Sequence, residues 1–151
     1  MATFQPGDPA YDLRVRASFE RQSMMKTLGA SLERVAPGEV DIRLGFRADL
    51  TQQHGFLHAG VLTSIADSAC GYAALTLMPK DAAVLTVEFK VNLMAPGAGE
   101  AFVARARVLK AGRTLTTCSA DVFAVNGGDE THVFTMLGTL MTVQKRAGLS
   151  D

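Results

Sequence analysis

The sequence contains no tryptophan, and cysteine is nearly as scarce, with only Cys70 and Cys118 among 151 residues. Two cysteines do not form a disulfide framework in a chain of this size, and both lie in apolar runs, so we interpret them as buried free thiols. A secretory signal is also missing, because the first residues, MATFQPGDPAYDLRVR, lack a basic stretch followed by an apolar one. We therefore expect the protein in the reducing environment of the cytoplasm.

The sequence also lacks an excess of charge of either sign. Its 15 basic and 15 acidic residues give a formal net charge of zero, so no overall positive field is available to hold nucleic acid or an anionic membrane. Residues 61–78 form an apolar stretch long enough to span a bilayer, but Asp67 interrupts it. A central carboxylate costs about 2.5–3.5 kcal/mol on insertion scales. We expect neither nucleic-acid binding nor a membrane span.

The length and composition favour one domain over residues 1–151, with loose ends at 1–9 and 144–151. A chain of this size buries enough surface to fold without a disulfide or a metal. Apolar residues at helical spacing predict a surface helix over 10–28, which Gly29 ends. Two segments around Pro37-Gly38 alternate between apolar and polar residues and predict a hairpin with one buried face.

The second half of the chain predicts a long helix followed by strands. Residues 61–78 are apolar on all sides, which is typical of a buried helix, and His58-Ala59-Gly60 opens it. Turn residues then separate four strand segments, which are 83–94, 101–110, 114–125 and 131–143. No helix lies between these strands, so we expect them to pair antiparallel as a meander.

These elements predict an α+β fold in which an antiparallel sheet of about six strands wraps around one long central helix, with an additional N-terminal helix. A single sheet does not cover a helix that is apolar on every side. Two sheets from two chains cover more of it, so we expect a dimer at least.

Asp67 is the only charged residue between Thr51 and Pro79. A carboxylate in apolar surroundings is costly unless it is paired or used, and burial should raise its pKa. The helix start at Ala59 carries N–H groups without intrahelical partners, which suit a developing oxyanion. Asp67 lies eight residues further on, or roughly 12 Å along the axis. One helix therefore does not bring both groups to the same carbon, whereas two antiparallel helices in a dimer would.

The string HGFLHAGVLTSIADSACGYAA, followed by TVEFKVNLMAPG, resembles the hotdog-fold acyl-CoA thioesterases of the PaaI-like group. Gln52 matches the family's amide position, and His58-Ala59-Gly60 matches its H-G-G motif with alanine for the first glycine. Asp67 matches the acidic residue of the central helix, and Thr86 matches a hydroxyl residue of the third strand. The resemblance runs from about Leu28 to Val143 and is most specific over residues 52–74.

This resemblance implies hydrolysis of acyl-CoA thioesters. The Ala59 N–H would bind the thioester carbonyl, and Asp67 of the partner subunit would activate water or attack directly. Gln52 and Thr86 would position the reacting groups. No cofactor or metal is implied, since coenzyme A enters as part of the substrate. The resemblance also suggests a dimer of dimers.

Several residues are expected to contact the substrate. Gly60 allows close backbone approach at the helix start, and the shape of the acyl pocket would depend on the packing of Phe56, Leu57 and Tyr72. Lys90 and Arg113 are candidates for binding the coenzyme A phosphates.

Alternative interpretations exist for the same residues. Asp67 could be a structural carboxylate, and His58 is more easily explained as a residue that fixes the loop through its ring N–H than as an acid or base. A metal site of His54, His58 and Asp67 is disfavoured because Gly55 opposes a helix there. Two other functions are compatible with the fold, which are an enoyl-thioester hydratase or dehydratase and a non-catalytic acyl-CoA-binding module.

Overall fold

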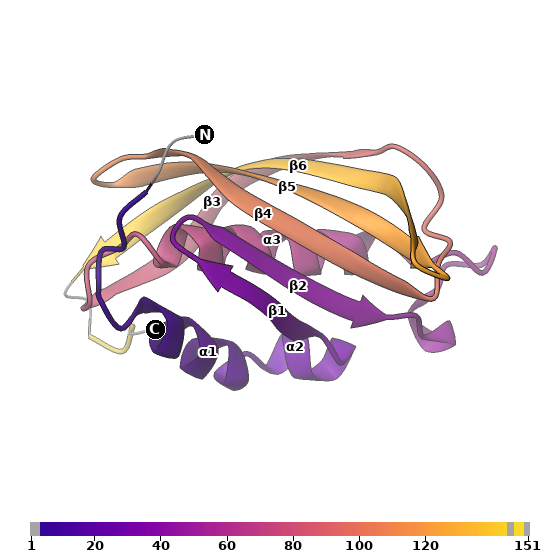
Figure 1. The fold of residues 1–151 in the computed structure, drawn as a ribbon, viewed down its shortest axis with the longest axis horizontal. Helices are drawn as coiled ribbons and strands as arrows, with labels where there is room; N and C mark the ends of the chain where they lie inside the picture. Colours follow the sequence, from indigo (N-terminus) through magenta and orange to yellow (C-terminus); the bar gives the residue numbers. More distant parts are fainter. Residues whose placement is uncertain (1–3, 145–146, 150–151) are drawn as a thin grey trace.

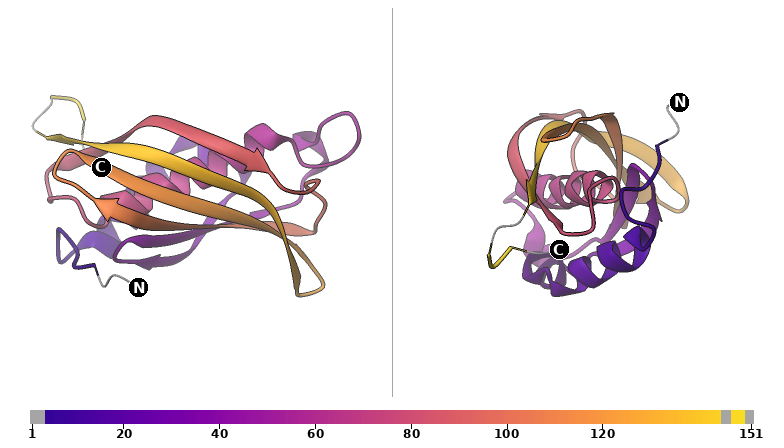
Figure 2. Two further views of the ribbon diagram at one scale, coloured as in Figure 1. Left: turned by 90° about the horizontal axis from the view of Figure 1, so that it is seen from above. Right: turned by 90° about the vertical axis from the view of Figure 1, so that its left-hand side faces the viewer.

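The computed structural model describes residues 4–144 and 147–149 and confirms the predicted α+β architecture (Figure 1). A six-stranded antiparallel sheet curls around one long helix, and two short helices cover its open side near the N-terminus (Figure 2). The helices are α1 (Tyr11–Arg21), α2 (Ser23–Leu28), α3 (Ala59–Leu75) and a 3-10 turn, Ala48–Leu50. The strands are β1 (Ser31–Ala36), β2 (Glu39–Gly45), β3 (Ala82–Leu93), β4 (Ala101–Ala111), β5 (Leu115–Asn126) and β6 (Asp129–Gln144).

Helix α3 forms the centre of the core, as its uniformly apolar sequence predicts. Its buried residues face the concave side of the sheet and include Leu62, Ile65, Ala66, Ala69 and Ala73. The helix ends three residues earlier than expected, because the Leu77 and Met78 N–H groups bind carbonyls only three residues back and so form a tighter turn. The Thr76 hydroxyl donates to the Ala73 carbonyl at 2.7 Å. The same hydroxyl accepts the Gly38 N–H at 2.8 Å, which ties the helix end to the first hairpin.

The expected meander of four consecutive strands is wrong for its first member. The strand order is β1-β2-β4-β5-β6-β3, so β3 pairs with β6 at the sheet edge and not with β4. Strands β4, β5 and β6 do form a meander, because short turns join them. The longer connection after β3 instead runs past the end of the sheet, where the Met94 N–H binds the Val133 carbonyl and the Glu100 N–H binds the Val125 carbonyl.

The single helix expected over residues 10–28 is divided in two at Gln22. The Gln22 backbone is extended, with φ −77° and ψ 100°, and its N–H binds the Phe19 carbonyl. Helix α2 then turns away and ends at Gly29, as predicted, where φ is +75°. This break places the side chain of Gln22 beside α3.

Within the N-terminus that was expected to be loose, Asp8 is buried, whereas Gln5, Gly7 and Pro9 are exposed. The Gly7 N–H donates to the Thr76 carbonyl at 3.2 Å, and a side chain at Gly7 would collide with the Leu77 carbonyl. Residues 1–3, 145–146 and 150–151 of the two expected loose ends lie outside the described residues. No helix in the described part of the chain has the length and apolar character needed to cross a membrane.

Candidate active site

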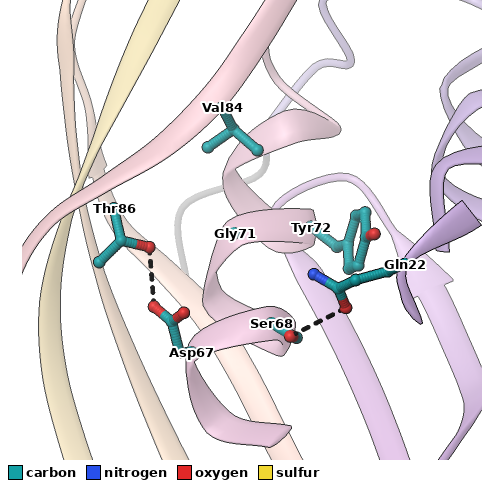
Figure 3. A pocket seen from close by; sticks show the side chains of 7 residues that line it. All are labelled: Gln22, Asp67, Ser68, Gly71, Tyr72, Val84 and Thr86. Atoms are coloured by element: carbon teal, nitrogen blue, oxygen red, sulfur yellow. Dashed lines mark hydrogen bonds between the residues drawn. The ribbon is translucent and has the colours of Figure 1, made fainter. Parts of the chain in front are cut away.

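Asp67 lies midway along α3 and points toward strand β3, where Thr86 meets it (Figure 3). The Thr86 hydroxyl donates to the Asp67 carboxylate at 2.7 Å. Partial burial raises the pKa of Asp67 above its ordinary value, and the hydrogen bond from Thr86 opposes part of this rise. Asp67 and Thr86, which the sequence assigned to separate positions, are therefore hydrogen-bonded to each other, and Asp67 also lines the adjoining cavity.

A cavity of about 110 Å³ adjoins Asp67 between α3, β3 and the break at Gln22. Its remaining lining residues are Gln22, Ser68, Gly71, Tyr72, Val84 and Thr86. The Ser68 hydroxyl donates to the Gln22 side-chain oxygen at 3.1 Å, so the N-terminal helices contribute a polar wall (Figure 3). Of the residues predicted to bind substrate, only Tyr72 lies here.

The loop before α3 is a tight turn built around Gln52. The Gly55 N–H donates to the Gln52 carbonyl at 3.0 Å, and the Gln52 N–H donates to the Phe56 carbonyl at 2.9 Å. Gly55 permits this turn because its φ is +84°. The Gln52 side-chain oxygen accepts the His54 N–H, so the amide nitrogen is the part of Gln52 that remains available as a donor.

His58 caps the start of α3. Its Nδ1 accepts the Gly60 N–H at 2.8 Å, and its carbonyl accepts the Val61 N–H at 2.9 Å. The ring therefore fixes the loop as a hydrogen-bond acceptor and not through a ring N–H as expected, which in the neutral imidazole leaves the proton on Nε2. Within the described residues no acceptor binds the Ala59 N–H. This N–H stays available at the positive end of the helix dipole.

The Ala59 N–H belongs to a second, larger cleft of about 470 Å³. Gln52, Phe56, Leu57 and His58 line one side of this cleft, and Leu93, Met94, Ala95, Pro96 and Gly97 line the other. Gly97 lies close to Leu57, because the Leu57 N–H donates to the Gly97 carbonyl at 2.9 Å. The two cavities share no lining residue. As the helix geometry predicts, one chain holds its Asp67 and its own Ala59 N–H apart.

The two predicted phosphate-binding residues lie away from both cavities. Lys90 occupies the outer face of β3 and donates to Asn92 at 2.8 Å. Arg113 lies in the β4–β5 turn and lines a separate hollow at the opposite end of α3, beside Leu77 and Met78. The structure therefore does not bring Lys90 and Arg113 together.

The three side chains considered for a metal site have separate partners. His54 lies next to Gln53, His58 caps the helix, and Asp67 binds Thr86. Over residues 4–144 and 147–149, no group of three histidine, cysteine, aspartate or glutamate side chains is arranged to hold a metal ion.

Sequence reasoning missed four lining residues of the Asp67 cavity, which are Gln22, Ser68, Gly71 and Val84. A glycine inside an otherwise strong helix is a recognisable signal, because it weakens the helix and needs another reason to be there. Nothing in the local sequence connects Gln22 with Asp67, because 45 positions separate them and only the tertiary fold brings them to the same cavity.

Comparison with known proteins gives consistent matches. The model of the family described as the thioesterase superfamily matches residues 54–131. Human acyl-coenzyme A thioesterase 13 is 29% identical over 72% of this chain and 78% of its own. A thioesterase family protein from Silicibacter pomeroyi is 51% identical, covers 89% of this chain and 99% of its own, and superposes with a TM-score of 0.88. The E. coli PaaI protein from the phenylacetic acid degradation operon shares the fold, with 22% identity, coverage of 88% and 93%, and a TM-score of 0.79.

Proposed function

The chain belongs to the thioesterase superfamily, and we propose that it hydrolyses acyl-CoA thioesters with Asp67 of one protomer acting opposite the Ala59 N–H of its partner. Membership of this family confirms the resemblance drawn from the sequence, the hotdog fold and the thioester hydrolase class. The acyl-CoA substrate, the residue roles and the shared site are the proposed part.

The separation of the two functional groups within one chain is the observation that carries the proposal. Asp67 and the Ala59 N–H are about 12 Å apart along α3 and line different cavities. A thioester carbon must lie within about 3 Å of water held by the base while its oxygen meets the N–H donor. A second α3 running antiparallel to the first would bring each Asp67 toward the other helix start.

Strand β3 supports such a dimer because it forms an edge of the sheet and, among the described strands, pairs only with β6. Its inner face, on the side of Thr86, presents Phe89 and Leu93 with 43% and 56% of their surface exposed. An edge strand with exposed apolar side chains is a template for pairing with another strand. Pairing of two β3 strands about a two-fold axis would continue the sheet and set the two α3 helices antiparallel.

In the proposed reaction, the Asp67 carboxylate takes a proton from a water molecule, and the resulting hydroxide attacks the thioester carbon. The carbonyl oxygen becomes an oxyanion that the Ala59 N–H stabilises. The carbon–sulfur bond then breaks, and the coenzyme A sulfur takes the proton back, which gives the free acid and the thiol. Thr86 holds the carboxylate in place, and the Gln52 amide nitrogen orients water or carbonyl.

The raised pKa of Asp67 suits this role. A base with a higher pKa accepts a proton more readily, provided that the pH is high enough to keep it ionised. Activity should therefore fall at low pH along an acid limb that lies above the ordinary pKa of aspartate.

The test is thiol release from a panel of acyl-CoAs by wild type and Asp67→Asn. Asparagine keeps the shape and the acceptor for Thr86 but removes the base, so kcat should fall at least about 100-fold. Equal activity of the two proteins would reject the role of Asp67, and an inert wild type would reject acyl-CoA hydrolysis. A single turnover in ¹⁸O-water tests for direct attack: general-base catalysis puts the label in the product acid alone, whereas direct attack followed by hydrolysis of the anhydride at the Asp67 carbonyl puts it in the Asp67 carboxylate.

A further inference from the structure

The hollow beside Asp67 owes its existence to Gly71. Gly71 lies one turn after Asp67 on α3, and a side chain there would project into the cavity that Asp67, Tyr72 and Val84 line. A Cβ atom added at Gly71 would meet only Val84 Cγ1, at 4.0 Å, which is ordinary van der Waals contact. The fold therefore does not require glycine at this position, although glycine inside a helix is less favourable than alanine.

The cavity is too small for a whole ligand. Sites for complete small molecules have volumes of about 300–1,000 Å³, whereas this cavity measures about 110 Å³. It suits one compact portion of a substrate. Because Asp67 forms part of its wall, that portion is the one next to the reacting carbon.

The far wall of the cavity is polar. The Gln22 side-chain oxygen is engaged by Ser68, at 3.1 Å, which fixes the amide plane. Its nitrogen has no acceptor among the described residues and is turned toward Gly71 (Figure 3). Ser68, which anchors it, is only 8% exposed. A fixed N–H donor that faces a partly buried cavity favours a ligand that offers an acceptor.

We propose that this hollow is the acyl-recognition pocket of the chain, that Gly71 sets the bulk it admits, and that Gln22 selects a compact acyl group with a hydrogen-bond acceptor beyond the thioester. This inference rests on the proposed hydrolysis of acyl-CoA. Gly71 and Gln22 are specificity-determining residues and take no part in bond breaking.

The first test measures kcat/KM for acyl-CoAs of increasing bulk in wild type and Gly71→Ala. One methyl group in a fitted pocket changes discrimination by about 10–200-fold. Gly71→Ala should therefore lose at least about 10-fold more on the bulkiest acyl group that wild type accepts than on acetyl-CoA. Gly45→Ala is the matched control, because a Cβ at Gly45 meets nothing within 4 Å and Gly45 lines neither cavity. Should Gly71→Ala fold poorly, Val84→Ile adds a methyl group to the opposite wall and should give the same bias.

The second test concerns the acceptor. Butanoyl-CoA is compared with 3-hydroxybutanoyl-CoA, and pentanoyl-CoA with 4-oxopentanoyl-CoA. Wild type should prefer at least one oxygenated member by about 10-fold or more in kcat/KM, and Gln22→Met, which keeps the length but not the amide, should lose that preference. Gln5→Met is the control at an exposed glutamine outside both cavities.

Binding separates this inference from the proposed function. Dissociation constants are measured by calorimetry for the matching non-hydrolysable S-alkyl-CoA thioethers. One outcome is that wild type binds the thioethers with the expected bias by size and by oxygen and yet hydrolyses no acyl-CoA. In that case the proposed hydrolysis is rejected and the pocket assignment stands. The assignment is overturned if no thioether binds, if Gly71→Ala keeps the wild-type size profile, or if Gln22→Met keeps the wild-type oxygen preference.

Discussion

Mixing two inactive variants, Asp67→Asn and Ala59→Pro, should restore thioesterase activity if each site takes one residue from each of two protomers. Proline removes the N–H at Ala59 and puts a ring in its place. It is well tolerated at the first position of a helix, and the preceding residue, His58, already has the extended ψ of 137° that a following proline requires. Ala59→Gly keeps the N–H and is the active control.

The size of the recovery follows from the arrangement of the sites. A mixed dimer contains one site with both defects and one site with neither. Random pairing makes about half of the dimers mixed, so about a quarter of wild-type sites are restored, whether or not dimers associate further. Each parent alone should retain about 1% of wild-type activity or less if it loses a factor of about 100.

The assay is thiol release by heterodimers purified through two different affinity tags, which should reach about half of wild-type activity per dimer. The control pairs a wild-type chain with the double variant that carries both substitutions. In this heterodimer every shared site has one defect, so it should be inactive. A heterodimer of the two single variants that stays inactive, together with an active control heterodimer, would refute the shared site and place the reaction within one chain.

Four further outcomes follow from individual contacts. Thr86→Val removes the hydrogen bond that lowers the pKa of Asp67, so the acid limb of the kcat profile should move to higher pH, and Thr86→Ser should restore it. Asp67→Asn should melt at a higher temperature than wild type at pH 7, because the pKa of Asp67 is higher in the folded than in the unfolded state and its charged form therefore destabilises the fold. Below about pH 3 Asp67 is protonated in both states, so scanning calorimetry should show that the difference vanishes. Phe89→Lys should give inactive monomers in size-exclusion chromatography with light scattering, whereas Leu13→Lys, at a residue that is 72% exposed, should not change association. Arg14→Met removes hydrogen bonds to backbone carbonyls after α3 and should lower the free energy of unfolding in urea by about 1–3 kcal/mol, and an unchanged midpoint would show that Arg14 contributes nothing there.

The sequence predicted those features that depend on local patterns. Apolar residues on every side of residues 61–78 predicted the buried helix, and alternation predicted the strands. The family resemblance singled out Asp67 and Thr86 separately but did not predict their hydrogen bond, because 19 positions separate them and their contact depends on where β3 lies. The position of β3 was predicted incorrectly. Short turns indicate that consecutive strands pair as hairpins, but the sequence of a longer connection does not show whether the next strand pairs with the previous one or elsewhere in the sheet.

The contribution of the N-terminal helices to the site was not predictable in this way. Helical spacing over residues 10–28 is continuous, so the break at Gln22 has no local signal. The break coincides with the contact between Gln22 and Ser68, which lies 46 positions away. Tertiary contacts of this kind override local propensity and are invisible to periodicity.

Three unfavourable features are concentrated on α3. Asp67 carries a charge in a partly buried position, Gly71 weakens the helix interior, and the Ala59 N–H has no acceptor in the described chain. Apolar packing on the remaining sides of the helix is sufficient to hold it in place despite these features. Departures from local rules of this kind are expected at functional sites. In the mechanism proposed above, Asp67 would activate water, the space beside Gly71 would hold the acyl group and the Ala59 N–H would stabilise the oxyanion, so one helix would supply the three requirements of thioester hydrolysis.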